Sequence, residues 1–477
     1  MVYTFNQRED INAGMNDYGN KITFWNSGLL TLGYCWDTTY NQGISLTYSD
    51  TLGNLIWKKN IYHQTSSILQ GNDIISLNNY SFYLTGITYS DSVNQYDGFL
   101  AKFDSNGDSI FYKYYSDIGT NWPTQLYQKS TDSLFILTNW KTNYNDVYNK
   151  YSIWAIDTTG NNIDTVFQSP TTLKQADQIL KKGARYYIGG TTRTSASSSF
   201  NSKVFIDVLN LNFNPLTTWN PSTTLNERFE KIFEWNNKLY FSSEVSVSVP
   251  TSANDYWQVR IKQIDEPSGI TLNSLDIGPP NLFWTVSSNP VLIDNTKFAI
   301  INNNEIQNYC FIIDSSLTPI CISNLWANYV SYSGYWAPGS ITLTPGKKIA
   351  GTGYVSSFLG YTLDHWLYIT ENIETFYIDS CSNFLEINES NNRLSSFIMY
   401  PNPANDVVHL EYQLPENISQ STVNVYNYAG MLLKSFTIYG NTGKTTQNVA
   451  ELSNGFYIFN IISSNTIIAR QKIVIDK

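Results

Sequence analysis

The sequence predicts an all-β protein, a seven-bladed β-propeller followed by a small immunoglobulin-like β-sandwich. The composition favours strands, because aromatic residues make up 15% of the chain and charged residues only 14%. Strand-like segments recur at a period of about 50 residues, which is typical of propeller blades. At 477 residues the chain is also longer than one compact core usually holds, so a repeat array or two domains are expected.

The repeat extends over residues 1–380. Its clearest members are three strands, at 97–104, 150–157 and 364–371, each largely apolar and each ending in an acidic residue. The acidic residues that mark the repeat stand at positions 50, 104, 157, 207, 265, 314 and 371, and the successive differences are 54, 53, 50, 58, 49 and 57. In several repeats, the strand that ends in the acidic residue is preceded by a strand that ends in small residues. Further strands flank these two strands. Four strands in each of seven repeats predict seven blades.

The first residues of the chain are expected to close the ring. Residues 2–6 are similar to the outermost strand of a blade, but the other strands of such a blade do not accompany them. We expect this segment to pair with the last blade, because a closed ring leaves no open sheet that could aggregate. Residues 375–378 are the alternative for this role.

An Asp-x-x-Gly turn follows several of the repeat strands. Asp accepts hydrogen bonds from main-chain amides of such a turn and Gly takes its left-handed position, so the motif has a sufficient structural cause. Residues 50–57 fit the pattern Asp-x-x-Gly-x-x-x-Trp, residues 104–111 come close to it, and the region resembles bacterial β-propeller repeats with this signature. The repeats marked by Asp207, Asp314 and Glu371 depart from the pattern, because they lack the turn glycine.

Residues 394–477 form a separate unit after a polar linker at 381–393. Its short strands with turn signals between them predict the immunoglobulin-like sandwich. Four short motifs occur in the unit in order. They contain Tyr400, Pro401, Asn402 and Pro403, then the turn residue Gly430, then Gly455 and Tyr457 in a Leu-Ser-x-Gly-Phe-Tyr stretch, and finally the basic residues Arg470 and Lys472.

These motifs make the unit similar to the type A C-terminal sorting domain, or Por secretion tail, of substrates of the bacterial type IX secretion system. The resemblance implies two partners, the secretion machinery and a sortase-like peptidase that removes the tail. It also implies passage through the periplasm to the outer-membrane surface or to the medium. The first residues lack the basic and apolar regions of a secretory signal, so we expect a signal peptide that is absent from this sequence.

Two of the four cysteines are expected to form a disulfide bond. Cys310 and Cys321 flank a turn centred on residues 315–316, so the two side chains would face each other across a hairpin. An oxidising compartment would permit the bond. Two free buried thiols are the alternative. Cys35 and Cys381 are the remaining pair.

Bulk properties argue against several classes of function. A net charge of −10 and a pI of about 4.9 argue against nucleic-acid binding. No apolar run approaches the roughly 18 residues of a membrane-spanning helix. The cysteines form no Cys-x-x-Cys pair and the three histidines no metal motif, so no metal, cofactor or catalytic residue is predicted.

Aromatic residues in predicted loops are the best functional indication, because exposed rings stack on sugars and anchor protein partners. The candidates are Trp326, Tyr332, Tyr335 and Trp336, with Trp140 in another loop. Packing between blades is the alternative role. We expect a non-enzymatic module that binds a glycan or a surface protein. The alternative is a secreted hydrolase that acts on polysaccharide with carboxylates near the propeller axis.

Overall fold

The computed structural model describes residues 3–9, 16–78, 80–90, 95–115, 120–141, 150–161, 163–170, 173–193, 202–222, 226–247, 256–277, 285–286, 290–303, 308–325, 336–356, 363–372, 396–414, 419–427, 432–463 and 466–477. The chain divides into two compact units, Met1–Ser382 and Asn383–Lys477. The predicted linker at 381–393 lies outside the described residues. Within the described ranges, no helix has the length and apolarity to cross a membrane.

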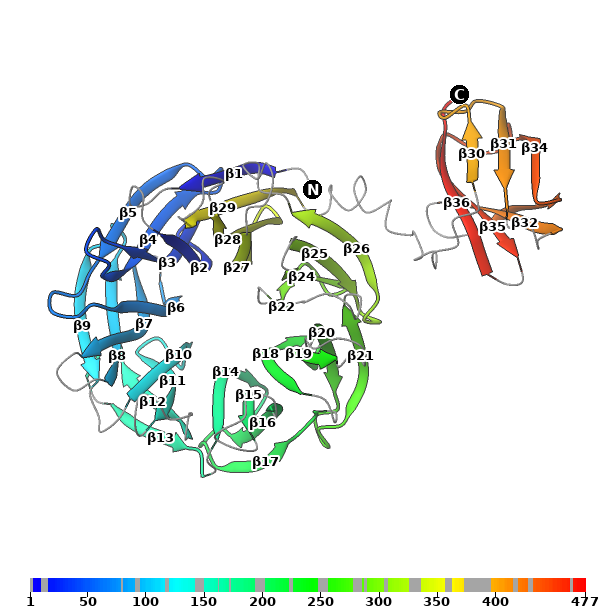
Figure 1. Cartoon of the computed structure of the whole chain (residues 1–477). Coiled ribbons are helices and arrows are strands. Elements are labelled where there is room, and N and C mark those ends of the chain that lie inside the picture. The colour runs from blue at the N-terminus through cyan, green and yellow to red at the C-terminus, as the bar shows by residue number, and fades with distance from the viewer. Residues whose placement is uncertain are drawn as a thin grey trace. The chain divides into compact units, whose positions relative to one another are not determined.

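The first unit is a β-propeller, as predicted, and its described residues form seven sheets. Figure 1 shows these sheets side by side around a central axis. We number them in chain order. Sheets 1 to 3 contain β2(Asp17–Trp25), β3(Gly28–Trp36), β4(Gln42–Asp50), β5(Leu55–Ile61); β6(Leu69–Ser76), β7(Ser81–Ser90), β8(Gln95–Asp104), β9(Ser109–Tyr115); and β10(Thr120–Gln128), β11(Ser133–Lys141), β12(Lys150–Asp157), β13(Asp164–Gln168).

Sheets 4 to 7 continue the ring in the same order. They contain β14(Lys174–Lys182), β15(Arg185–Arg193), β16(Ser202–Asn210), β17(Pro215–Trp219); β18(Glu227–Trp235), β19(Lys238–Val247), β20(Tyr256–Ile264), β21(Thr271–Ile277); β22(Thr285–Val286), β23(Val291–Leu292), β24(Lys297–Asn303), β25(Asn308–Asp314), β26(Pro319–Leu325); and β27(Trp336–Leu343), β28(Lys348–Ser356), β29(Leu363–Asn372) with β1(Tyr3–Glu9). The first strand of a sheet is the innermost one in Figure 1.

The N-terminal strand closes the ring, as expected. β1 pairs antiparallel with β29 of sheet 7, for example with Gln7 opposite Leu367. The first and last parts of the propeller are thereby joined by main-chain hydrogen bonds rather than by packing alone. The alternative segment, residues 375–378, lies outside the described residues.

Sheets 1 to 5 each pack on the preceding sheet through an aliphatic residue of the innermost strand. These residues are buried, and each belongs to a core cluster that includes side chains of the preceding sheet. They are Ile22, Ile74, Leu126, Ile179 and Ile232. Because one four-stranded sheet cannot cover both of its faces alone, this stacking supplies the core of the unit.

Turns between the third and fourth strands follow the predicted chemistry. The carboxylate of Asp50, for example, accepts from the amide nitrogens of Leu52 and Asn54 at 2.8 and 2.9 Å. Asp207 is an exception, because it lies inside β16 and the turn begins at Asn210 instead. The turns of sheets 4 and 6 lack glycine, and Phe213 and Leu317 take the positive φ there, at 61° and 59°.

The second unit consists of two sheets, with strand orders β30-β31-β34 and β33-β32-β35-β36. Its strands are β30(Ser396–Tyr400), β31(Val407–Gln413), β32(Gln420–Asn427), β33(Leu432–Tyr439), β34(Thr442–Asn448), β35(Gly455–Ser463) and β36(Thr466–Ile475). Alternate residues of β31, such as Val408 and Leu410, are fully buried in the core of the unit. The immunoglobulin-like class stays a prediction.

Candidate functional site

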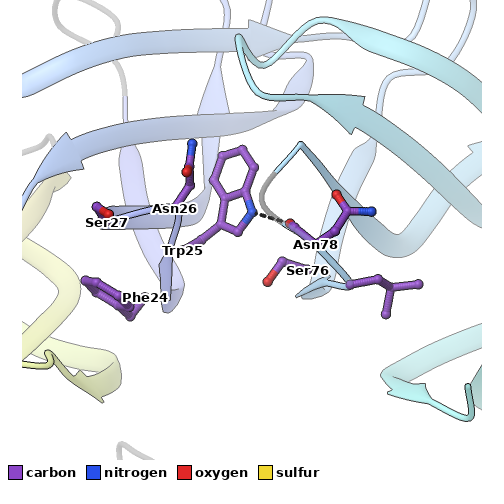
Figure 2. A pocket seen from close by; sticks show the side chains of 7 residues that line it. Phe24, Trp25, Asn26, Ser27, Ser76 and Asn78 are labelled. Carbon is purple, nitrogen blue, oxygen red and sulfur yellow. Dashed lines mark hydrogen bonds between the residues drawn. The ribbon is translucent and has the colours of Figure 1, made fainter. Parts of the chain in front are cut away.

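A cavity of about 400 Å³ lies between sheets 1 and 2, where their innermost strands end (Figure 2). Sheet 1 contributes the end of β2 and the turn to β3, and sheet 2 contributes the end of β6 and the turn to β7. The lining residues are Phe24, Trp25, Asn26, Ser27, Ser76, Leu77 and Asn78. The volume is in the range that small-molecule sites occupy.

A hydrogen bond joins the two walls of this cavity. Trp25 is buried, and its Nε1 donates to the main-chain oxygen of Asn78 at 2.8 Å (Figure 2). The side-chain oxygen of Asn78 accepts from the amides of Tyr80 and Ser81, at 2.8 and 2.9 Å, which keeps the opposite wall in place. The site is therefore largely preformed.

The turn between β2 and β3 has only two residues, Asn26 and Ser27. Both have positive φ, 44° and 67°, as a tight hairpin turn of the primed type requires. Both side chains are exposed at the cavity. The hydroxyl of Tyr48 donates to the main-chain oxygen of Asn26 at 2.6 Å and so supports the turn from the third strand.

The cavity lining is polar but carries no charge. It offers two amides and two hydroxyls, from Asn26, Asn78, Ser27 and Ser76, together with the half-buried Phe24, whose ring also packs against the core cluster of Ile22 and Leu29. The described residues give the side chains of Asn26, Ser27 and Ser76 no hydrogen-bond partner. Neutral amides and hydroxyls can exchange hydrogen bonds with the hydroxyls of an uncharged sugar, and an aromatic ring can stack on its apolar face.

A second set of polar side chains follows the innermost strands. Strands β2, β6, β10, β14 and β18 each contain a β-bulge at the same place. The bulge residues are Asn20, Asn72, Thr124, Asp177 and Glu230. In sheets 1 to 3 the bulge side chain donates to a main-chain oxygen of the next sheet. The pairs are Asn20 Nδ2 with Gly71 (3.3 Å), Asn72 Nδ2 with Pro123 (2.7 Å) and Thr124 Oγ1 with Ala176 (3.2 Å).

The residues after the bulges also connect neighbouring sheets, and we call them the axial ring. They are Lys21, Asp73, Gln125, Gln178 and Lys231. Three of them accept from a main-chain amide of the next sheet, in the pairs Asp73 with Leu126 (2.8 Å), Gln125 with Ile179 (2.6 Å) and Gln178 with Ile232 (2.7 Å). Lys21 forms an ion pair with Asp73 at 2.7 Å. Buried amides of the innermost strands are thereby satisfied.

The bulge residues of sheets 4 and 5 are acids. Burial raises the pKa of Asp177 to about 7, against the opposing effects of a hydrogen bond from Gln175 and the positive charge of Lys231. Burial, followed by repulsion from Glu244, raises the pKa of Glu230 well above its usual range. Burial lowers the pKa of Lys231. Two carboxyls whose pKa values are raised by burial therefore lie on adjacent innermost strands.

Neither the cavity residues nor the axial ring was predicted from the sequence, although a signal for the axial ring was present. The aliphatic residues at 22, 74, 126, 179 and 232 lie at intervals of 52, 52, 53 and 53, and each follows two polar residues. This spacing is more regular than that of the acidic strand ends. The cavity has no comparable signal, because its residues come from two sheets.

The predicted aromatic site is described only in part. Trp326, Tyr332 and Tyr335 lie outside the described residues. Trp336 begins β27, opposite Val355. Trp140 lies within β11 rather than in a loop, and it is half-buried. The two described residues belong to sheets 7 and 3, so the structure places them in different sheets.

The predicted disulfide bond between Cys310 and Cys321 is wrong. Cys310 is a free, buried thiol that lies opposite Ser323, while Cys321 lies opposite Ile312. The prediction assumed a symmetric hairpin. A register shift after Ile312 offsets the two strands, so the cysteines are diagonal neighbours instead.

Cys35 is also a free, buried thiol, so it does not pair with Cys381. Burial raises the pKa of both Cys35 and Cys310 to about 12. At neutral pH both sulfurs are therefore thiols, which react slowly with oxidants and electrophiles. In the part of the chain that the structure describes, no group of His, Cys, Asp and Glu side chains could hold a metal ion.

The first sorting motif, Tyr400 to Pro403, connects β30 to β31. The peptide bonds before Pro401 and Pro403 are cis. The side chain of Asn402 accepts from the amide of Val474 at 2.8 Å, which ties the motif to the last strand. Lys444 donates to the carboxylate of Glu411 at 2.6 Å, and the hydroxyl of Tyr400 bonds to both.

The other sorting residues follow along the last two strands. Gly455 begins β35 at a φ of 154°, and the buried Tyr457 donates to the main-chain oxygen of Ser453 at 2.8 Å. Arg470 and Lys472 lie on β36, opposite Asn460 and Ile458. Gly430 lies outside the described residues.

Comparison with known families identifies the second unit. Residues 398–476 match the family model of the secretion system C-terminal sorting domain. This unit is a type IX sorting domain, so it is recognised by the type IX machinery, and the protein is secreted or carried on the cell surface. No protein of the curated set matches the chain.

Solved structures resemble the chain in fold. BamB from Moraxella catarrhalis is 12% identical, with a TM-score of 0.37, covering 77% of this chain and 99% of that one. The β-propeller domain of the Trilobed protease from Pyrococcus furiosus is 9% identical, with a TM-score of 0.38 and coverages of 80% and 97%. An oligogalacturonate lyase in complex with manganese is 10% identical, with a TM-score of 0.45 and coverages of 77% and 96%. Likeness at this level concerns the fold alone.

Proposed function

We propose that this β-propeller, exported by the type IX system, is a non-enzymatic module that binds a neutral glycan outside the cell. The observation that carries the proposal is the uncharged, preformed cavity between sheets 1 and 2. Its groups match the chemistry of a sugar ring, with hydroxyls around the edge and an apolar face. A ligand with a carboxylate, phosphate or ammonium group would find no counter-charge in this lining.

Each part of the cavity has a distinct role in the proposal. Phe24 provides the stacking surface, Asn26 and Ser27 bond to hydroxyls from one wall, and Ser76 and Asn78 do so from the other. The hydrogen bond from Trp25 fixes the separation of the walls before the ligand arrives. Preorganisation of this kind reduces the entropy lost on binding.

Glycan-array screening followed by calorimetry tests this role. Replacing Asn26→Gly and Ser27→Gly together removes two polar side chains while favouring the positive φ of the turn. We expect the double variant to lose affinity about 30-fold, since each of the two neutral hydrogen bonds contributes about 1 kcal/mol. The matched control is Asn236→Gly with Asn237→Gly, in the equivalent turn of sheet 5, where φ is 51° and 58°. Equal effects of the two double variants, or no bound glycan, would count against the proposal.

A hydrolase is the second candidate, favoured by the two acids on the innermost strands. A glycosidase needs one carboxyl that holds a proton and one that is ionised. The raised pKa values of Asp177 and Glu230 suit the first role. The same glycans are incubated with the protein and with its Asp177→Asn variant. Reducing ends that appear only with the unaltered protein would favour the hydrolase.

The aromatic residues Trp326, Tyr332, Tyr335, Trp336 and Trp140 stay a predicted second surface. Alanine replacement of Trp326 and Trp336 tests it in the same binding assay. We further propose that a sortase-like peptidase removes the C-terminal unit after export and attaches the propeller to the cell surface or releases it. The match of residues 398–476 to the sorting family supports this step.

A further inference from the structure

The bulge position of the innermost strands makes the same contact in three sheets, and its chemistry changes in the fourth. Asn20, Asn72 and Thr124 donate to the main-chain oxygen of the residue that precedes the next bulge. Amide and hydroxyl groups donate at every pH at which the protein is folded. The equivalent residue of sheet 4 is Asp177, and a carboxyl can donate only when it carries a proton.

We propose that Asp177 is a protonation-dependent latch between sheets 4 and 5. When neutral, its O–H donates to the main-chain oxygen of Phe229, the residue that precedes the bulge of sheet 5. When ionised, it cannot donate and repels that oxygen. Of the contacts that the bulge residues of sheets 1 to 4 make with the next sheet, this is the one that depends on pH.

Phe229 is placed against sheet 4 by two further contacts. Its amide donates to the hydroxyl of Thr191 at 3.0 Å. Its ring lies on the backbone of Gly189, so closely that a Cβ there would come within 2.2 Å of it. The acceptor of the proposed bond is therefore held beside sheet 4 whatever the state of Asp177.

The charges around Asp177 act in both directions. On its own strand, Gln175 donates to the carboxyl at 3.1 Å. On β18, Lys231 favours the ionised form, whereas Glu230 repels it. The charges of Lys21 and Asp73 also act on Lys231 from across the axis. Those of Glu244 and Arg228 act on Glu230. Burial, which disfavours charge, outweighs these effects.

The direction of the pH effect follows from linkage. The pKa of Asp177 is raised to about 7 in the folded chain, whereas an exposed Asp titrates near 4. A carboxyl whose pKa is raised on folding stabilises the fold fully below the unfolded pKa. This contribution is lost as the pH rises through the folded pKa. The latch therefore holds under mildly acidic conditions and opens above about pH 7.

The test compares thermal unfolding of the full chain and two variants between about pH 4 and about pH 8. Asp177→Asn supplies a permanent donor like Asn20 and Asn72. We expect it to match the unaltered protein at the acidic end and to melt at a higher temperature at the basic end. Asn72→Asp makes the reciprocal change between sheets 2 and 3, and it should add a new loss of stability as the pH rises.

A melting difference between Asp177→Asn and the unaltered protein that does not change with pH would overturn the proposal. So would an Asn72→Asp variant whose pH dependence is unchanged. If a variant fails to fold, the 13C carboxyl resonance of Asp177 in labelled, unaltered protein decides the matter. A midpoint near 7, assigned by its absence in another Asp177 variant, supports the latch, and a midpoint near 4 overturns it.

Discussion

At the scale of single residues, two neighbouring sheets carry the same buried ion pair with the charges exchanged. In sheet 4, Lys174 binds Asp207 at 2.7 Å, and in sheet 5, Lys262 binds Glu227 at 2.8 Å. Lys174 and Glu227 each stand three residues before the bulge of the innermost strand. Asp207 and Lys262 occupy matching places on the third strands, opposite Ile188 and Phe241. In these two sheets the opposite charges are kept while the sign at each position is exchanged.

Removing one member of this pair should destabilise the propeller strongly. We expect Asp207→Asn to lower the free energy of unfolding by about 3 to 5 kcal/mol, because Lys174 would be left buried without its counter-charge. The double variant Lys174→Glu with Asp207→Lys copies the arrangement of sheet 5 and should recover part of the loss. The rest of the loss should remain, because the hydroxyls of Tyr151 and Thr218 donate to the carboxylate of Asp207, which the double variant lacks. Urea unfolding measures the stability of these variants. If the losses caused by Lys174→Glu and by Asp207→Lys alone simply add up in the double variant, the coupling between the two residues is refuted.

At the scale of elements, the turns of one sheet are covered by the outer strand of the sheet before it. Gly107 has a φ of 76°, and a Cβ there would come within 2.8 Å of the Trp57 ring. Gly160 has the same φ and meets Phe111 in the same way. The indole of Trp57 also donates to the main-chain oxygen of Ser105 at 3.1 Å. The Asp-x-x-Gly-x-x-x-Trp signature thus joins two sheets, since its Gly receives the aromatic residue of the preceding copy.

A pair of glycine substitutions separates this contact from backbone strain. Gly183 has a φ of 57°, and a Cβ added there would have no atom within 4 Å, so Gly183→Ala should show the strain alone, about 1 kcal/mol. Gly107→Ala should lose about 1 to 3 kcal/mol more, because its methyl group collides with Trp57. Chemical denaturation of the two variants measures the difference. Equal losses would show that Trp57 moves aside freely.

At the scale of the whole molecule, closure of the ring depends on the start of the chain and not on its end. β1 pairs with β29, and the sorting unit forms a compact body of its own. Removal of the tail after export would therefore leave the closing strand in place. This arrangement suits a protein whose C-terminal part serves only for sorting.

Two truncations test this division. Deleting residues 1–9 exposes the edge of β29, so we expect a lower melting temperature and association between exposed edges. Deleting residues 383–477 should leave the melting transition of the propeller unchanged. Calorimetry and light scattering record both properties. A propeller that unfolds without its tail would contradict the prediction.

Much of the architecture could be predicted because it depends on interactions between residues close in sequence and because the same pattern repeats along the chain. The turn residues Asp50 and Asp104 act through atoms within four residues, so their pattern is visible in the sequence. Asp207 is not a turn marker, because its function in the ion pair depends on Lys174 from a different strand. The prediction of a Cys310–Cys321 bond failed for a similar reason, since a single register shift in the hairpin changes which residues face each other.

Local pattern was enough to specify the strand content, the repeat, the N-terminal closing strand and the sorting unit, since each depends on short-range periodicity or on motifs in order. Where chemistry can occur became visible only once the chain was folded. The cavity joins Phe24 and Asn26 to Ser76 and Asn78 of the next sheet. The proton affinity of Asp177 arises from burial that no local pattern encodes. Contacts between sheets depend on how the ring stacks, and stacking brings together residues about 50 positions apart in the chain.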